Sequence, residues 1–238
     1  MRIIFIGSVI FSKSLLSHML KKKYNIVGVQ TKKNSNFNSD HYDLKKICEK
    51  KEIPCRYTDN INNYKSINWM KKLKPDLILC LGWSSLLNIK VLNIPSNGTI
   101  GFHPTKLPLN RGRHPIIWTL ALGIKETACT FFYMNTKADA GNIISQKKIK
   151  ISANDNATSL YNKITECSKK LIDNFLPKLK KKIIYILILK IKNFLIIGEK
   201  DLILMVKLIG ECQLKIYITL LEALHILILM HILCTIKK

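Results

Sequence analysis

The chain is poor in arginine and in acidic residues, so its charge is strongly one-sided. Its 39 basic residues face 15 acidic ones, a formal net charge of +24, and the arginines among them are Arg2, Arg56, Arg111 and Arg113. Because lysine codons are A-rich, an AT-rich gene explains this bias. A basic surface that attracts nucleotides, tRNA or other anions by long-range steering is the functional alternative. Net charge alone does not choose among such partners.

The cysteines lack any metal-binding or disulfide spacing. Seven are scattered along the chain without a CxxC or CxxH pair, at Cys48, Cys55, Cys80, Cys129, Cys167, Cys212 and Cys234. This argues against a zinc site and against a disulfide framework, and favours a reduced, cytoplasmic protein with no bound metal. The first apolar run is interrupted at Gly7 and Ser8, which is unlike a signal peptide.

No uncharged run is long enough to cross a membrane. The longest lies at residues 223–236, inside a segment of unusual composition in which Ile and Leu make up 28 of the 56 residues from 183 to 238. A transmembrane helix needs about 20 apolar residues. The charges of this segment keep to no single helical face, which also disfavours an interfacial helix. We therefore expect no membrane partner.

A frameshift explains this apolar tail. When the back-translated codons are read one nucleotide earlier, three windows, at residues 197–201, 205–212 and 216–231, restore Trp, Asp and Pro. Our hypothesis is that one nucleotide was lost in the A-run that encodes residues 180–182. The chain then divides into a folded domain at residues 1–179 and an aberrant tail at 180–238 without a selected fold.

Short apolar runs alternate with longer amphipathic ones before the tail. This pattern is typical of an α/β fold, a Rossmann-like parallel sheet flanked by crossover helices. Expected strands are residues 3–6, 26–29, 77–81, 99–102, 130–134 and 143–149, and expected helices are 13–22, 42–51, 64–72, 115–122 and 158–176. In such sheets ligands bind beyond the carboxyl ends of the strands, which is where His103 and Asp139 fall.

Two segments carry the chemistry. HPTKLPLNRGRHPIIW at residues 103–118 follows a predicted strand, and ADAGNIISQ at 138–146 follows the next. Taken alone, His103 could be a hydrogen-bonded loop anchor, and Asp139 could close an Asx turn. As a pair they make a base and its orienting carboxylate. The single glycine of FIGS is weak evidence for a dinucleotide site.

Together with FIGSVIFS at residues 5–12 and LCLGWSSLL at 79–87, these segments resemble the catalytic domain of the N10-formyltetrahydrofolate-dependent formyltransferases. That family includes methionyl-tRNA formyltransferase and nucleotide-sugar N-formyltransferases. The resemblance covers about residues 1–179, and the restored frame is similar to the start of the family's C-terminal, barrel-like domain. It implies formyl transfer from 10-formyltetrahydrofolate to a primary amine.

The resemblance also implies roles for individual residues. His103 matches the catalytic histidine and Asp139 the aspartate. Members usually carry an Asn two positions before the histidine as an oxyanion donor, whereas this chain has Gly101, so Thr105, a backbone N–H or water would have to substitute. The substrate loop is expected to comprise Leu107, Pro108, Arg111, Gly112 and Arg113, and the folate pocket Leu81, Gly82, Trp83, Lys137, Ala138 and Gly141.

The acceptor amine is predicted from the segment after the second strand. Methionyl-tRNA formyltransferases usually insert a basic, glycine-containing loop there, but QTKKNSNFNSDHYDL at residues 30–44 has two lysines and an acidic end. This favours a small acceptor, and NSDHYDL resembles the sugar-enzyme version of the region. We predict a nucleotide-linked 4-amino sugar and a possible homodimer. Alternatives are methionyl-tRNA, an inactive product of a decayed gene, and the less favoured glycinamide ribonucleotide.

Overall fold

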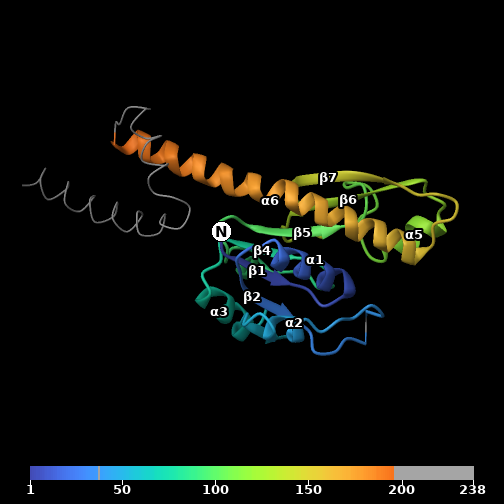
Figure 1. The fold of residues 1–238 in the computed structure, drawn as a ribbon, viewed down its shortest axis with the longest axis horizontal. Coiled ribbons are helices and arrows are strands. Elements are labelled where there is room, and N and C mark those ends of the chain that lie inside the picture. Colours follow the sequence, from blue (N-terminus) through green and yellow to red (C-terminus); the bar gives the residue numbers. More distant parts are fainter. Residues whose placement is uncertain (37, 196–238) are drawn as a thin grey trace, which may run out of the picture. The chain divides into compact units, whose positions relative to one another are not determined.

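The computed structural model describes residues 1–36 and 38–195, with side chains through residue 179 (Figure 1). Contacts within the chain divide it into two units, Met1–Lys178 and Leu179–Lys238. The first unit contains the whole sheet and both predicted site segments. The three windows of the frameshift hypothesis, from residue 197 onward, lie outside the described residues.

One seven-stranded sheet organises the first unit, in the order β3-β2-β1-β4-β5-β6-β7. Its strands are β1 (Ile3–Ile6), β2 (Ile26–Thr31), β3 (Cys55–Tyr57), β4 (Leu77–Cys80), β5 (Thr99–His103), β6 (Glu126–Tyr133) and β7 (Ile143–Lys150). Strands β1 to β5 pair in parallel, which confirms the Rossmann-like expectation. The last two strands differ, because β6 pairs antiparallel with both β5 and β7. The connection between β6 and β7 is too short for a parallel crossover, which needs a dozen or more residues.

The helices also follow the expected order, with local differences. They are α1 (Ile10–Lys21), α2 (Lys45–Glu49), α3 (Tyr64–Lys72), α4 (Ile89–Leu92), α5 (Pro115–Ala121) and α6 (Ala157–Leu195). Helix α2 is shorter than predicted because the Asp43 carboxylate accepts the Lys45 backbone N–H at 2.9 Å, which makes residue 43 part of the turn before the helix. Helix α6 continues past its predicted end, through Pro177.

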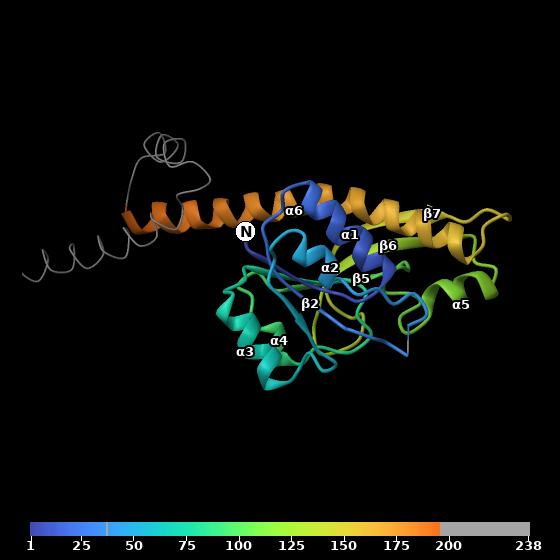
Figure 2. The same ribbon diagram turned by 60° about the horizontal axis from the view of Figure 1, so that its bottom comes forward.

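The helices cover both faces of the sheet (Figure 2). Helices α3 and α4 lie on one face, where Met70 and Val91 pack in a buried cluster with Ile4, Ile6 and Ile78 of the strands. Helices α1 and α6 cover the other face. There four aromatic rings contact one another in series, one from α1, two from the strands and one from α6. They belong to Phe11, Phe102, Phe131 and Phe175, and the successive centroid separations are 4.6, 5.0 and 5.0 Å. Burying both faces leaves the carboxyl ends of the parallel strands as the place for a site.

Candidate active site

His103 is the last residue of β5 and is 5% exposed. Its Nε2 lies 3.0 Å from the carbonyl oxygen of Asn110, and its Nδ1 lies 3.6 Å from Oδ2 of Asp139. Because a carbonyl oxygen only accepts, Nε2 carries a hydrogen in this arrangement. Nδ1 faces the Asp139 carboxylate at 3.6 Å, which is beyond hydrogen-bond distance and makes an ion pair when the ring is protonated.

The backbone of the β6–β7 connection places Asp139. Asp139 itself has a left-handed φ of 49°, and its Oδ2 accepts the backbone N–H of Gly112 at 3.2 Å. A side chain on Gly141 would overlap the carbonyl oxygen of Tyr133, so glycine lets the two strands approach closely here. The carboxylate therefore bonds to the loop that follows β5, 27 residues away, as well as facing His103.

The loop after His103 is attached to the sheet by side chains of β6 and β7. Thr130 Oγ1 donates to the Thr105 carbonyl oxygen at 2.6 Å, and Gln146 Nε2 donates to the Leu107 carbonyl oxygen at 3.0 Å. The buried Thr105 hydroxyl lies 3.0 Å from the Leu109 oxygen and 3.2 Å from the Asn110 oxygen. In this arrangement its one proton is directed at loop carbonyls.

The space beside Gly101 is occupied by apolar side chains. A Cβ atom at this position would lie 2.8 Å from Cγ and 3.1 Å from Sδ of Met134, and 3.1 Å from Cζ of Phe132. A thioether and a phenyl ring carry no hydrogen-bond donor. The position expected to hold an Asn is therefore both empty of a side chain and closed to one.

The other predicted loop residues lie at the rim. Arg111, Gly112 and Arg113 are exposed, as is Pro108, whereas Leu107 is 4% exposed. Two residues of the predicted folate pocket, Lys137 and Ala138, are also exposed. The structure thus brings His103, Asp139 and Gly112 into contact and leaves the arginines at the surface around them.

The Leu81–Trp83 stretch follows β4. The Leu81 carbonyl accepts the Ser12 hydroxyl at 2.5 Å, and Gly82 has a positive φ of 79°. The Lys32 ammonium lies 5.1 Å from the centroid of the Trp83 ring. The indole Nε1 of Trp83 is buried without a protein partner, so a ligand with an acceptor group fits this position.

Four more buried polar atoms without partners lie near Trp83 in the fold. Two of them lie at the end of β2, one follows β1, and one belongs to the segment that forms a β-bridge with Val9. In that order they are Gln30 Oε1, Thr31 Oγ1, Ser8 Oγ and His41 Nδ1. An unsatisfied buried polar atom costs about 1–3 kcal/mol. Sequence reasoning missed this group, although polar residues at the ends of buried strands were the available signal.

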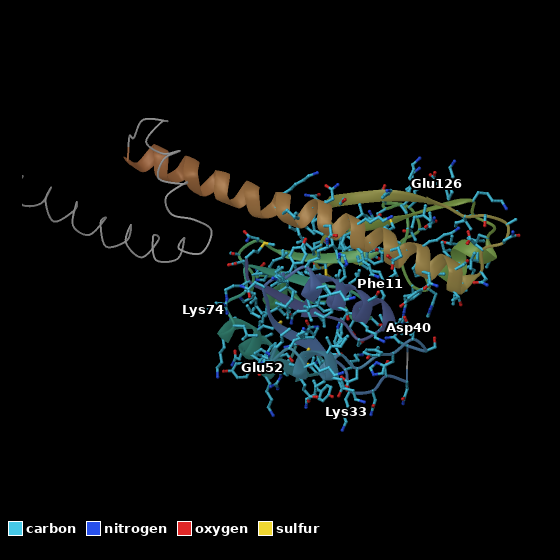
Figure 3. The ribbon with its side chains drawn as sticks, in the orientation of Figure 1. Phe11, Lys33, Asp40, Glu52, Lys74 and Glu126 are labelled. Atoms are coloured by element: carbon cyan, nitrogen blue, oxygen red, sulfur yellow. The ribbon has the colours of Figure 1, made fainter. Side chains whose placement is uncertain are left out.

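The segment after β2 covers these strand ends. The Ile10 N–H donates to the Asp40 carbonyl, and the Tyr42 N–H to the Ser8 carbonyl, both at 2.9 Å. The Tyr161 hydroxyl of α6 donates to the Asp40 carboxylate at 2.6 Å, and burial together with this carboxylate raises the pKa of Tyr161. Asp40 and Lys33, labelled in Figure 3, mark the segment. Hydrogen bonds therefore hold this segment to residues of α1 and α6.

Neither a metal centre nor a membrane span occurs among residues 1–36 and 38–195. No group of three or more His, Cys, Asp or Glu side chains in this range could hold a metal ion. No helix in it is long and apolar enough to cross a membrane.

Comparison with known proteins places these features in a family context. The model of the formyl transferase family matches residues 1–176. A methionyl-tRNA formyltransferase of Thermotoga neapolitana is 32% identical over 183 residues, 75% of this chain and 58% of that protein. The bifunctional polymyxin resistance protein ArnA of Wigglesworthia glossinidia brevipalpis is 39% identical over 138 residues, 58% of this chain and 21% of that protein. The chain therefore spans less than two thirds of the length of these relatives.

A solved structure shares the fold. The phosphoribosylglycinamide formyltransferase of Bacillus halodurans superposes with a TM-score of 0.66 at 20% identity, covering 75% of this chain and 95% of that one. At this level of identity the likeness concerns the arrangement of strands and helices.

Proposed function

The chain belongs to the formyl transferase family, and we propose that it transfers a formyl group from 10-formyltetrahydrofolate to a primary amine in the cytoplasm. The observation that carries this proposal is the buried His103 with Asp139 at 3.6 Å, at the carboxyl edge of the sheet. When bound, 10-formyltetrahydrofolate supplies an electrophilic formyl carbon to the acceptor nitrogen. Leu81, Gly82 and Trp83 would hold it, the unpartnered Trp83 N–H being a suitable donor.

The residues of the pair then have distinct tasks. His103 takes a proton from the attacking amine, or donates one to the developing oxyanion when it is protonated. Asp139 holds the ring from Nδ1 and stabilises its charged form. Before His103 can work through Nε2, the Asn110 carbonyl that occupies this nitrogen has to move. The rate should therefore depend on the loop between residues 104 and 114.

For the acceptor we propose a nucleotide-linked 4-amino sugar. The segment that would have to reach into a tRNA is instead bound to β1, α1 and α6 through Ser8, Ile10 and Tyr161. Asn38 adds a further tie, since its Nδ2 lies 3.0 Å from the Ser84 hydroxyl. A segment held at this many points suits a small acceptor. The exposed Arg111 and Arg113 supply positive charge for the diphosphate.

Methionyl-tRNA is the second candidate. Relatives named for that activity match 75% of the chain, and a net charge of +24 suits a polyanion. A nucleic acid acceptor predicts a rate that falls steeply with salt, whereas a sugar nucleotide predicts a weak dependence.

Formyl transfer assays separate these acceptors. The full chain is incubated with 10-formyltetrahydrofolate and either dTDP- and UDP-4-amino sugars or methionyl-tRNA, with Asp139→Asn as the matched control. We expect turnover of a sugar nucleotide that the control lowers. Turnover of methionyl-tRNA alone would replace the sugar by the second candidate. Sedimentation of the same preparation checks the expected homodimer.

We also propose that residues 180–238 are a frameshifted remnant of a C-terminal domain. The family match ends at residue 176, four residues before the lysine run, and the relatives are longer than the region they share with this chain. Resequencing the A-run tests this, and an uninterrupted reading with no other open frame downstream would contradict it. If the assays above are silent and a frame-restored chain is active, the present chain is the inactive product of a decayed gene.

A further inference from the structure

Two thiols meet between β6 and α6, away from the candidate active site. Cys129 is fully buried, with its Sγ 3.3 Å from the Ile164 carbonyl oxygen and 3.5 Å from the Ser168 hydroxyl. Cys167 lies on the turn of α6 that contains Ile164 and Ser168, and it is partly exposed. Residues 164, 167 and 168 share one face of α6, so the Cys167 thiol adjoins the Cys129 sulfur, and each thiol shifts the pKa of the other. The buried Cys129 thiol therefore lies next to the partly exposed Cys167 thiol.

The surroundings favour the thiolate at the outer position. The hydrogen bond from Cys129, with Lys147 and Lys170 nearby, lowers the pKa of Cys167 to about 7. The same hydrogen bond, together with burial, raises the pKa of Cys129. The thiolate is the reactive form of cysteine, so these surroundings favour a reactive Cys167 and a protonated Cys129.

A second thiol pair serves as an internal comparison. Cys48 of α2 and Cys55 of β3 also shift each other's pKa, and Cys55 is partly exposed. Its charged neighbours include Asp43 and Glu49, which oppose a thiolate, and one lysine, Lys45. The Cys129 and Cys167 pair has lysines alone among its charged neighbours.

We propose that Cys167 and Cys129 form a redox-sensitive dithiol that a hydroperoxide converts to a disulfide. The Cys167 thiolate attacks the peroxide oxygen, the O–O bond breaks, and Cys167 becomes a sulfenic acid with release of water or an alcohol. The Cys129 thiol then attacks the Cys167 sulfur, the S–O bond breaks, and a second molecule of water leaves with the Cys129 proton. Two thiols are oxidised and one peroxide is reduced.

Oxidation would replace one weak hydrogen bond of the pair. Cys129 loses a weak thiol contact to the Ile164 oxygen, but the Ser168 hydroxyl still donates to that oxygen at 2.7 Å. Cys129 also precedes Thr130, whose hydroxyl holds the active-site loop at Thr105. Oxidation therefore occurs one residue from a support of the candidate site.

Peptide mapping tests the dithiol independently of formyl transfer. A full-length chain with Cys212→Ser and Cys234→Ser is treated at about pH 7 with an equimolar amount of hydrogen peroxide, alkylated, digested and analysed by mass spectrometry. We expect a peptide linking Cys129 to Cys167, with two hydrogens lost, while Cys48 and Cys55 stay alkylated. A linked Cys48–Cys55 peptide appearing first, or unmodified Cys167, would overturn the proposal.

Single variants distinguish the two thiols. Cys129→Ser should leave Cys167 as a sulfenic acid that dimedone traps, and Cys167→Ser should abolish both products. The matched control Cys55→Ser should form the Cys129–Cys167 link like the parent. Circular dichroism establishes that each variant is folded. Dimedone adduct on Cys129 in the Cys167→Ser variant would contradict the assigned order of attack.

Discussion

The variant Gly101→Asn alone should lose stability, whereas Gly101→Asn combined with Met134→Ala should be accommodated and raise kcat. Gly101 is buried in β5, and a Cβ there would lie 2.8 Å from Cγ of Met134. That is shorter than van der Waals contact, so Gly101→Asn forces Met134 and its neighbour Phe132 to move. Overpacking of this kind typically costs about 1–3 kcal/mol of unfolding free energy.

The double variant Gly101→Asn/Met134→Ala removes the overlap with the flexible Met134 side chain. Met134 is partly buried against the sheet cluster, so Met134→Ala alone should cost about 1–2 kcal/mol, below the range for a fully buried methionine. The double variant should be more stable than the sum of the two losses predicts, by about 1 kcal/mol or more. With the amide accommodated, kcat for formyl transfer should rise about 100-fold or more, because one oxyanion donor is worth about 3 kcal/mol.

Urea unfolding of the parent, both single variants and the double variant measures the coupling, and initial rates measure the donor. Gly123→Ala, at a glycine with a φ of 61° and no heavy atom within 4 Å of a Cβ, shows the cost of an added methyl group without a clash. Additive losses within about 0.5 kcal/mol would refute the steric argument. If the stability losses are not additive but the double variant has an unchanged kcat, the donor role of the amide is refuted.

Three further outcomes are expected. Asp139→Asn should lower kcat about 10- to 100-fold with little change in unfolding free energy, because an amide can still accept the loop N–H but leaves the histidine without its counter-charge; steady-state rates check this. Gly141→Ala should cost more than about 3 kcal/mol in urea unfolding and Gly123→Ala about 1 kcal/mol, since only the first overlaps backbone. The hydrogen bond to the Asp43 carboxylate raises the pKa of Tyr57 to about 12, so this stabilisation is complete below pH ~10 and is lost as pH rises through the folded value; ultraviolet titration should show Asp43→Asn lowering that pKa.

The predictable part of the fold is the part built from local pattern. The apolar run at Ile3–Ile6 and the amphipathic run at Tyr64–Lys72 have the bounds that periodicity predicts. The strand Cys55–Tyr57 and the helix Ile89–Leu92 were missed, because three half-buried residues and a single turn carry no measurable period. The antiparallel direction of β6 was missed too, since a buried apolar run looks the same in either orientation.

The site shows the same division between local and distant information. His103 and Asp139 stand in short motifs at strand ends, but β6 ends opposite the start of β5, so the 3.6 Å approach depends on the β6–β7 connection returning to His103. The filling of the Gly101 position by Met134 and the tie from Asp40 to Tyr161 join residues 33 and 121 positions apart. No motif in a single sequence encodes such contacts. The sequence of the segment after β2 favours a small acceptor, whereas the hydrogen bonds that hold this segment in place are visible in the structure alone.

The histidine and aspartate depend on different strands, and this decides how the site can fail. His103 is fixed by the end of β5, whereas Asp139 is fixed by a turn that Gly141 allows to close. Their side chains are 7% and 19% exposed, so their attraction is screened less than that of a surface ion pair. A change in the turn should consequently weaken catalysis through the loss of this attraction, even where His103 stays in place. A Gly141→Ala variant that keeps the parent kcat, while Asp139→Asn lowers it, would contradict this dependence.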